Sequence, residues 1–326
     1  MTQHFRSVIA LALGGVLLAT AVNAQTLRVA TTPSAPHPWI DAAEKFKEEV
    51  EARTDYTVEI FTGGQLGNDP TVVDEMRIGT VDFMFGGVQN VASFVRDFEF
   101  FQLNYLWGDF DTFKAATEPD SAVFQHMAQA VEDADVGMKL VALLGGGIRN
   151  LSSSHAPVTS PADLEGVRMR VTGSRLDADT WGALGAITTS VPWTEVYTAL
   201  QTGVVSAFES TISGMYGARH YEVASYHSQT EHQFMMSHMS MATATWERMS
   251  EEDRQVILEA ATIAGRHGTE VGARNDIELL EALKERGVEV IEVDKTPFIE
   301  GTAHLHDENA ERLGLTDLLQ TVRDMH

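Results

Sequence analysis

Residues 161–171 read PADLEGVRMRV, residues 191–210 read VPWTEVYTALQTGVVSAFES, and together these two segments predict an α/β fold. Short β-type runs alternate with helical patterns from one segment to the next. The expected elements are, in order, a short helix after Ser160-Pro161, a strand over 167–171, a helix over 175–184, a strand near Ile187, a helix over 194–201 and a strand over 204–208. Such alternation is typical of an α/β domain with a largely parallel sheet.

The N-terminal half of the chain shows the same alternation. The expected elements there are strands over 26–30, 57–61 and 81–85, with helices over 39–53 and from an Asp69-Pro70 cap to about Gly79. Asp69 is read as the N-cap, because an acidic side chain can accept hydrogen bonds from the first turn and proline suits the first helical position. A second α/β domain therefore precedes the segments quoted above.

A glycine run and a long helix connect the two halves. The run at 145–147 is a natural place for the chain to reverse or cross over. Residues 251–286, after the capping residue Ser250, predict a long helix, and residues 297–326 predict further helices. Three glycines in the long helix indicate bends or close packing: Gly265, Gly268 and Gly272. Since there is no low-complexity linker, we expect two domains joined by several crossovers.

Composition narrows the function. A length of 326 residues predicts about two domains. The chain has 47 Asp and Glu against 23 Lys and Arg, a formal net charge of −24, which argues against a nucleic-acid partner. It has no cysteine, which excludes thiolate metal sites and disulfides.

The chain also carries no catalytic signature. Zinc-protease, serine-hydrolase, phosphate-loop and dinucleotide patterns are missing from the sequence. The spacing of His304, His306 and Asp307 fits no strong zinc signature. We therefore expect no enzyme, no metal and no cofactor.

Residues 1–24 have the order of features of a secretory signal peptide. His4 and Arg6 give a short basic start, a mostly apolar run follows, and small residues precede a cleavage site after Ala24. The apolar run is short for a membrane span, which needs ~20 residues. The sequence therefore predicts an exported protein, in a bacterial periplasm, that begins at Gln25 and has a net charge of −25 after removal of one arginine and no acids.

Two arginine segments and a tryptophan are candidates for ligand binding. Arg149 follows the glycine run, and Arg168 and Arg170 share one face of the strand VRMRV. A guanidinium fixed near a cleft can bind a carboxylate through two parallel hydrogen bonds. From residue types alone these arginines could equally pair with the many acids at the surface. Trp193, at a helix start, could form either core or a pocket wall.

The motifs resemble one family closely. PADLEGVRMRV, then ALGA, then VPWTEVYTALQTGVVSAFES resemble the solute-binding subunit of tripartite ATP-independent periplasmic (TRAP) transporters, the DctP type. The earlier GGQLGN and RIGTVDFMFGG resemble further segments of that family in the same order. The resemblance covers essentially the whole chain after residue 24.

The resemblance implies the architecture of a class II-like periplasmic binding protein. Two α/β domains would enclose a ligand cleft, be crossed by the chain more than once and be braced by a long helix. The first domain would comprise 25–147 with 236–275, and the second 148–235 with 276–326. Ligand would close the cleft by a hinge motion.

The resemblance also implies site residues, matched one at a time. The matched positions are Arg170, Arg149, Trp193, Ser210, Gly173, Gly87, Thr32 and Phe234. Arg170 matches the arginine that clamps the ligand carboxylate, Arg149 a second arginine that contacts the acid, and Trp193 an aromatic residue against the ligand body. Gly173 lies in the loop after the clamp strand.

Other matched positions depart from the family pattern or admit a second interpretation. Ser210 stands where many members have asparagine, so the ligand of this protein cannot be inferred from the ligands of those members. Glu209 keeps the acid of that motif. Thr32 and Gly87 follow the first and third strands, both at expected cleft edges. Some relatives have an acid at position 87, and the glycine here leaves room and removes a partner for polar or cationic groups of a ligand. Phe234 could line the cleft or pack in the core.

The implied function is capture of a small organic carboxylate and its delivery to the small and large TRAP membrane subunits by a monomeric receptor. Candidate ligands are dicarboxylates, sugar acids, oxo or hydroxy acids, and a zwitterion such as ectoine. The alternatives are an extracytoplasmic ligand sensor for a signalling receptor and, with less support, an exported hydrolase.

Overall fold

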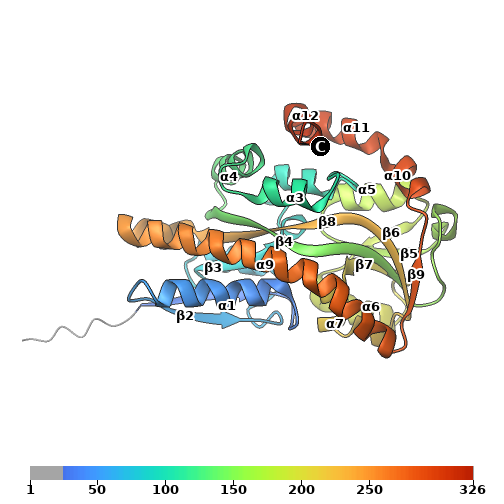
Figure 1. Ribbon diagram of the computed structural model, residues 1–326, viewed down its shortest axis with the longest axis horizontal. Coiled ribbons are helices and arrows are strands. Elements are labelled where there is room, and N and C mark those ends of the chain that lie inside the picture. Colours follow the sequence, from blue (N-terminus) through green and yellow to red (C-terminus); the bar gives the residue numbers. More distant parts are fainter. Residues whose placement is uncertain (1–24, 326) are drawn as a thin grey trace, which may run out of the picture.

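The computed structural model describes residues 25–325, and Figure 1 shows two α/β halves connected by two long strands. Within these residues nine strands form one sheet in the order β2-β1-β3-β8-β4-β7-β5-β6, with β9 paired to β8. The predicted α/β class with two halves is confirmed. The predicted signal peptide, residues 1–24, lies outside the described residues.

The first half begins with a parallel βαβαβ unit. Its elements are β1 (Thr26–Thr31), α1 (Pro38–Glu51), β2 (Thr57–Phe61), α2 (Asp69–Arg77) and β3 (Phe83–Gly87). β1 pairs in parallel with both β2 and β3, as the sequence predicts. Two 3-10 turns and two helices follow: η1 (Val88–Asn90), η2 (Arg96–Gln102), α3 (Phe110–Thr117) and α4 (Ala122–Ala134).

The cap of α2 differs from the prediction. Asn68 is the N-cap, and its side chain accepts a hydrogen bond of 3.1 Å from the Thr71 N–H. Asp69 is instead the first helical residue, where its side chain is buried and bound by two neighbours. The prediction that Asp69 caps the helix was wrong, because Asn68 is an equally good capping residue one position earlier.

Two long antiparallel strands carry the chain between the halves. β4 (Met138–Ser153) leaves the first half, and β8 (Tyr226–Ala242) returns to it. The glycine run 145–147 lies inside β4, at an irregularity in its pairing with β8, so it serves as a crossover rather than a chain reversal. Gly147 has φ +103°, which a residue with a side chain rarely adopts.

The second half lies between these two strands in the chain. Its elements are η3 (Pro161–Leu164), β5 (Arg168–Val171), α5 (Arg175–Ala183), β6 (Ile187–Ser190), η4 (Trp193–Glu195), α6 (Val196–Gln201), β7 (Ala207–Thr211), α7 (Ile212–Gly217) and η5 (His220–Glu222). β5 pairs in parallel with β6 and β7. The strand predicted at 204–208 begins at Ala207, because the Val205 N–H binds the Ala199 carbonyl and closes the end of α6.

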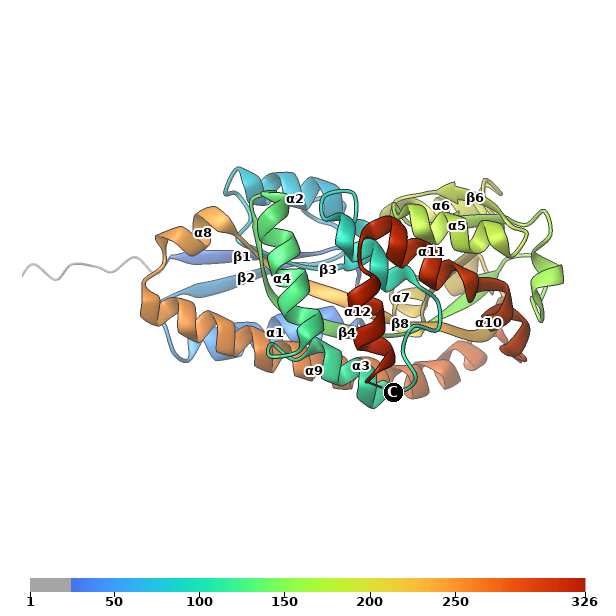
Figure 2. The ribbon, with the colours of Figure 1, turned by 90° about the horizontal axis from the view of Figure 1, so that it is seen from above.

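The chain ends in helices that pack against both halves. They are α8 (Thr243–Arg248), α9 (Glu251–Glu285), α10 (Thr296–Thr302), α11 (His304–Leu313) and α12 (Thr316–Arg323), with β9 (Glu289–Glu292) between α9 and α10. Ser250 caps α9 as predicted, and α9 runs along both halves (Figures 1 and 2). Among the helices of the described chain, none has the length and apolar character that crossing a bilayer requires.

The glycines of α9 permit close helix packing. A Cβ at Gly268 would lie 2.9 Å from the Ala42 Cβ of α1, and one at Gly272 would lie 2.9 Å from the backbone nitrogen of Gly147 in β4. The interpretation as close packing is therefore confirmed. These contacts place α9 directly on the crossing strand.

Apolar side chains fill both faces of the sheet in the first half. Val29 and Phe83 point toward α1 and α9, whereas their chain neighbours Ala30 and Met84 point toward α2 and α4. α12 packs on α4, and α11 packs on η2, so the C-terminal helices lie against the first half. This differs from the predicted assignment of all of 276–326 to the second domain; the division itself stays a prediction.

Candidate ligand-binding site

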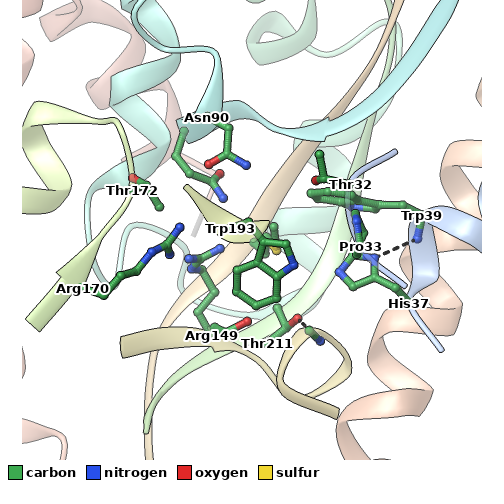
Figure 3. A pocket seen from close by; sticks show the side chains of 14 residues that line it. Thr32, Pro33, His37, Trp39, Asn90, Arg149, Arg170, Thr172, Trp193 and Thr211 are labelled. Atoms are coloured by element: carbon green, nitrogen blue, oxygen red, sulfur yellow. Dashed lines mark hydrogen bonds between the residues drawn. The ribbon is translucent and has the colours of Figure 1, made fainter. Parts of the chain in front are cut away.

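A cavity lies at the carboxyl ends of β1, β3, β5 and β7, the edge where α/β sheets bind ligands (Figure 3). It has about 370 Å³ of empty space, part of which is open to solvent. Its lining residues come from both halves of the molecule: Thr32, Pro33, His37, Trp39, Gln89, Asn90, Arg149, Arg170, Thr172, Trp193, Ser210, Thr211, Gly214 and Met235.

A second hollow adjoins the cavity and shares four of its residues. The shared residues are Thr32, Asn90, Arg170 and Trp193. This hollow has about 560 Å³ of space and extends to Asn68, Asp69 and Gly173. The two form one cleft between the halves, with Arg170 and Trp193 at its centre.

Arg170 is a buried guanidinium in the wall of this cleft. Its side chain is 2 % exposed, and its Nε donates a hydrogen bond of 2.9 Å to the Val191 carbonyl. Its Nη1 is buried and has no hydrogen-bond partner, since the nearest carboxylate oxygen, Glu209 Oε1, is 3.7 Å away. Burial lowers the pKa of Arg170 and Glu209 opposes that shift, yet an arginine stays charged in proteins. The wall of the cleft thus holds a charged donor that has no hydrogen-bond acceptor in the protein.

The second arginine is fully engaged by a carboxylate. Arg149 donates from Nε and Nη2 to the two oxygens of Glu209, a bidentate pair in which both side chains are buried. His232 Nε2 lies 3.7 Å from Glu209 Oε2. Burial alone would raise the pKa of Glu209, but Arg149 and His232 hold it below its usual range. Arg149, Arg170 and Glu209 together leave one net positive charge.

Trp193 supplies a flat apolar wall beside that charge. The guanidinium carbon of Arg170 lies 5.8 Å from the centre of the Trp193 ring, and the ring of His220 contacts it edge-on at 4.7 Å. Figure 3 shows Trp193 next to the ends of Arg149 and Arg170. A carboxylate on the arginines could therefore place its carbon skeleton against this ring.

The opposite side of the cleft is polar and holds one carboxyl group. Thr32 Oγ1 donates to Asp69 Oδ1 at 3.2 Å, and the Asn90 amide donates to Asp69 Oδ2. Burial raises the pKa of Asp69 to about 6, although these hydrogen bonds oppose the shift. This side offers hydrogen bonds to polar groups of a ligand but no cation for a second carboxylate.

The structure brings together most of the residues predicted for the site. Five line the first cavity: Thr32, Arg149, Arg170, Trp193 and Ser210. Gly173 lines the adjoining hollow. Gly214 leaves room for the Ser210 side chain, since a Cβ at 214 would lie 2.5 Å from the Ser210 hydroxyl.

Two predicted residues lie elsewhere. Phe234 points away from the cleft and stacks on Phe113, with ring centres 5.3 Å apart. Gly87 ends β3 but does not line either hollow; the Gln89 side chain occupies the space beside it, 2.4 Å from where a Cβ would stand. Phe234 is half-buried: it packs against the core, as its second interpretation has it, and also lines a hollow outside the cleft.

Several lining residues were not predicted. Thr172 and Thr211 lie at or just after the ends of β5 and β7, and Gln89 and Asn90 follow β3. Their position at carboxyl strand ends is a signal that the sequence contains. His37 and Trp39, at the start of α1, carry no such signal. Within residues 25–325 no group of three His, Asp or Glu side chains is placed to hold a metal ion.

Comparison with known proteins gives one consistent answer. The family described as bacterial extracellular solute-binding protein, family 7 (DctP), matches residues 29–313. A solute-binding protein of Roseobacter denitrificans is 32 % identical over 288 residues, which is 86 % of each chain. The 2,3-diketo-L-gulonate-binding periplasmic protein of Escherichia coli is 28 % identical over 86 % of this chain and 85 % of its own.

Solved structures of TRAP periplasmic solute-binding proteins share the fold. One from Bordetella bronchispeptica, with density assigned as pantoate, has a TM-score of 0.87 and 25 % identity and covers 93 % of this chain and 99 % of that one. One from Pseudomonas putida F1, with bound D-glucuronate, has a TM-score of 0.85 and 26 % identity and covers 91 % and 96 %. The chain therefore belongs to family 7 of the bacterial extracellular solute-binding proteins, the DctP-type binding proteins of TRAP transporters.

Proposed function

We propose that this protein binds a small organic monocarboxylate in the cleft and that Arg170 holds the carboxylate. The observation that carries the proposal is the buried Nη1 of Arg170, a charged donor without a hydrogen-bond partner in the cleft wall. A buried unpaired donor is costly, and a bound carboxylate would supply the missing acceptor. Arg149 adds a second positive charge next to the bound carboxylate, and Glu209 fixes the position of the Arg149 side chain.

The number of charges favours a single carboxylate. One net positive charge remains among Arg149, Arg170 and Glu209, and the far side of the cleft holds Asp69 instead of a cation. A second carboxylate would face Asp69 and lose its hydration without gaining a partner. Hydroxyl groups, by contrast, could bond with Asp69, Asn90 and Thr32, so we favour sugar acids and hydroxy acids over dicarboxylates.

Relatives support this class of ligand. D-glucuronate is bound in the Pseudomonas structure, pantoate is assigned in the Bordetella structure, and the Escherichia coli relative carries 2,3-diketo-L-gulonate in its name. Each of these acids has one carboxylate and further oxygen groups. Trp193 would pack on the carbon skeleton, while Ser210 and Gly173 would line its sides.

Binding would act by closing the two halves around the ligand. The cleft takes residues from both halves, so a ligand that contacts Arg170 and Thr32 together stabilises the closed arrangement. We propose that the closed form delivers its acid to the TRAP membrane subunits, and that residues 1–24 direct a monomeric protein to the periplasm.

A thermal-shift screen tests the proposed function. D-glucuronate, pantoate and 2,3-diketo-L-gulonate are compared with succinate and ectoine, and D-glucose serves as the matched ligand that lacks the carboxylate of glucuronate. A ligand at 100 times its Kd stabilises by about 2.7 kcal/mol, which raises the Tm of a chain this long by about 4 °C. Stabilisation by D-glucose with none by any of the carboxylates, ectoine included, would contradict the proposal.

A further inference from the structure

A larger hollow lies on the reverse side of the strands that cross between the halves. It has about 1040 Å³ of space, part of which is open to solvent, and it involves α3, β4, β8 and α9. Its lining residues are Phe110, Phe113, Gly145, Gly147, Ile148, Gln229, Glu231, Phe234, Thr269, Ala273, Asp276, Ile277, Leu280 and Glu281. None of these residues lines the carboxylate cleft.

The two spaces lie back to back across the same pair of strands. In β4, Ile148 lines the reverse hollow and Arg149 lines the cleft; in β8, Phe234 lines the hollow and Met235 lines the cleft. Successive residues of a strand point to opposite faces, so β4 and β8 form a shared wall. Phe234 lies away from the cleft because it belongs to this second space.

The walls of the reverse hollow are aromatic and aliphatic. The rings of Phe110, Phe113 and Phe234 contact one another, with ring centres 5.3 to 6.3 Å apart. Ile277 lies at the rim and is 74 % exposed, a large apolar side chain in contact with water. A ligand with an apolar body would cover this surface.

One carboxyl group in the hollow is incompletely bonded. Asp276 Oδ2 accepts a hydrogen bond of 2.8 Å from the Ile148 N–H, but Asp276 Oδ1 is shielded from solvent and has no hydrogen-bond partner. A Cβ at Gly147 would lie 2.8 Å from Oδ1, so the glycine makes room for this oxygen. A shielded acceptor without a donor is costly, and it marks a place where a donor would be bound.

The hollow carries a negative charge once Asp276 is ionised, above about pH 8. Three carboxyl groups line it, from Glu231, Asp276 and Glu281, and among the lining residues there is no Lys, Arg or His. From outside the hollow, Lys295 pairs with Glu231 and Lys284 pairs with Glu281, whereas no ion pair of the described residues involves Asp276. An anionic ligand would meet repulsion here, whereas a cation would be attracted.

We propose that the reverse hollow binds an organic ammonium ion, a primary amine with an aromatic or alkyl body. The ammonium group donates a hydrogen bond to Asp276 Oδ1, and the body packs against the rings of Phe113 and Phe234. A carboxylate that accepts from an ammonium forms a charge-assisted hydrogen bond, stronger than one to a neutral hydroxyl. Aromatic rings also attract a cation that lies over their faces.

The test is a calorimetric titration with 2-phenylethylammonium chloride at pH 8.5. Burial raises the pKa of Asp276 to about 8, so its carboxyl is mostly ionised at this pH, while a primary ammonium, like that of lysine, has a pKa of about 10. The neutral isostere 2-phenylethanol has the same body without the charge. We expect 2-phenylethanol to bind at least about tenfold more weakly than the ammonium ion.

Two variants locate the site. Asp276→Asn keeps the size of the side chain and removes the charge, and it should weaken binding of the ammonium ion at least about tenfold. Glu278→Gln removes the same charge from an exposed position of α9 that does not line the hollow, and it should change the Kd less than about twofold. Should Asp276→Asn fail to fold, the two ligands on the unaltered protein still decide the outcome.

Three results overturn the proposal. The first is that the unaltered protein shows no saturable binding of the ammonium ion. The second is that 2-phenylethanol binds as tightly as the ammonium ion. The third is that Asp276→Asn loses no more affinity for the ammonium ion than Glu278→Gln does. The proposal is supported when the unaltered protein and Glu278→Gln bind the ammonium ion with similar Kd values, while 2-phenylethanol, and the ammonium ion in Asp276→Asn, bind at least about tenfold more weakly.

Discussion

Glu209 accepts hydrogen bonds from both Nε and Nη2 of Arg149, and this buried pair fixes the charge of the cleft. Because both Glu209 oxygens are turned to Arg149, the guanidinium of Arg170 is left at ion-pair distance with one donor unused. Glu209 thus pairs with Arg149 and leaves Nη1 of Arg170 without a hydrogen-bond acceptor.

Replacing Glu209 should destabilise the fold. In Glu209→Gln, Arg149 and Arg170 would remain buried without a counter-charge, and breaking a buried pair costs about 3–5 kcal/mol. Glu48→Gln, which removes an acid that is 69 % exposed and pairs with Lys45, should cost less than about 1 kcal/mol. Urea unfolding of both variants measures the two free energies. Equal costs would show that the Glu209 pair contributes no more than a surface pair.

Much of the fold follows from local sequence signals. The parallel unit over β1 to β3 and the Ser250 cap of α9 depend on apolar spacing and capping residues that lie next to one another in the chain. The long strands β4 and β8 could not be predicted in the same way. Their pairing joins Met138 to Ala242, about a hundred residues apart, and their buried polar residues obscure the period of a strand.

The site shows the same division between local and distant information. Arg170 and Trp193 could be placed at the cleft because they lie in segments whose motifs resemble those of the family, whereas residue types alone left surface pairing and core packing open. The role of Glu209 as the partner of Arg149 depends on the pairing of β4 with β7, which sets Arg149 opposite Thr211. Phe234 differs from Met235 only by the face of β8 on which it lies, and the sequence alone does not distinguish the two faces.

Glycine at position 272 should be required for packing. Gly272→Ala places a Cβ 2.9 Å from the Gly147 nitrogen, and the backbone there cannot yield as a flexible side chain would, so we expect a loss of about 1–3 kcal/mol. Gly182→Ala in α5 is the matched control, because its Cβ would meet nothing within 4 Å. Alanine should stabilise that position by about 0.5–1 kcal/mol through helix propensity. Thermal unfolding measures both, and stabilisation by Gly272→Ala would contradict the close contact of α9 with β4.

Trp193 should contribute to ligand affinity through its ring. Trp193→Ala removes the wall next to Arg170 and should lower the affinity for the acid selected by the screen at least about tenfold, because a buried aromatic contact is lost. Trp193→Phe keeps a smaller ring and should lose less. Trp246→Phe, in α8 and outside the cleft, should leave the Kd unchanged. Calorimetric titration gives the three Kd values; an unaltered Kd in Trp193→Ala would remove this residue from the site.

Asp276 should make stability fall as pH rises. Its pKa, raised to about 8 by burial, means that the native protein keeps this proton where the unfolded chain has already lost it near pH 4. The native state then binds more protons between about pH 4 and pH 8, so the free energy of unfolding decreases with pH in that window. Asp276→Asn lacks this contribution. Its stability relative to the unaltered protein should therefore increase from pH 5 to pH 8.

The comparison is made by urea unfolding at pH 5, 6, 7 and 8 in the absence of any amine. Titrating groups far from Asp276 affect both proteins equally, whereas Glu231 interacts with the Asp276 carboxyl. Glu278→Gln, at an exposed position, controls for the general loss of a negative charge. A difference between Asp276→Asn and the unaltered protein that stays constant with pH would mean that Asp276 titrates at an ordinary pKa.

The role of Arg170 as the residue that holds the carboxylate is tested by the affinity of Arg170→Ala for the acid that the screen selects. Arg168→Ala, two residues earlier on β5 and exposed, is the matched control. Circular dichroism and thermal unfolding first establish that both variants are folded, and calorimetric titration then gives the Kd. The Kd for the acid should rise well over tenfold in Arg170→Ala and change less than about twofold in Arg168→Ala. A folded Arg170→Ala that binds the acid as tightly as the unaltered protein would contradict this role of Arg170.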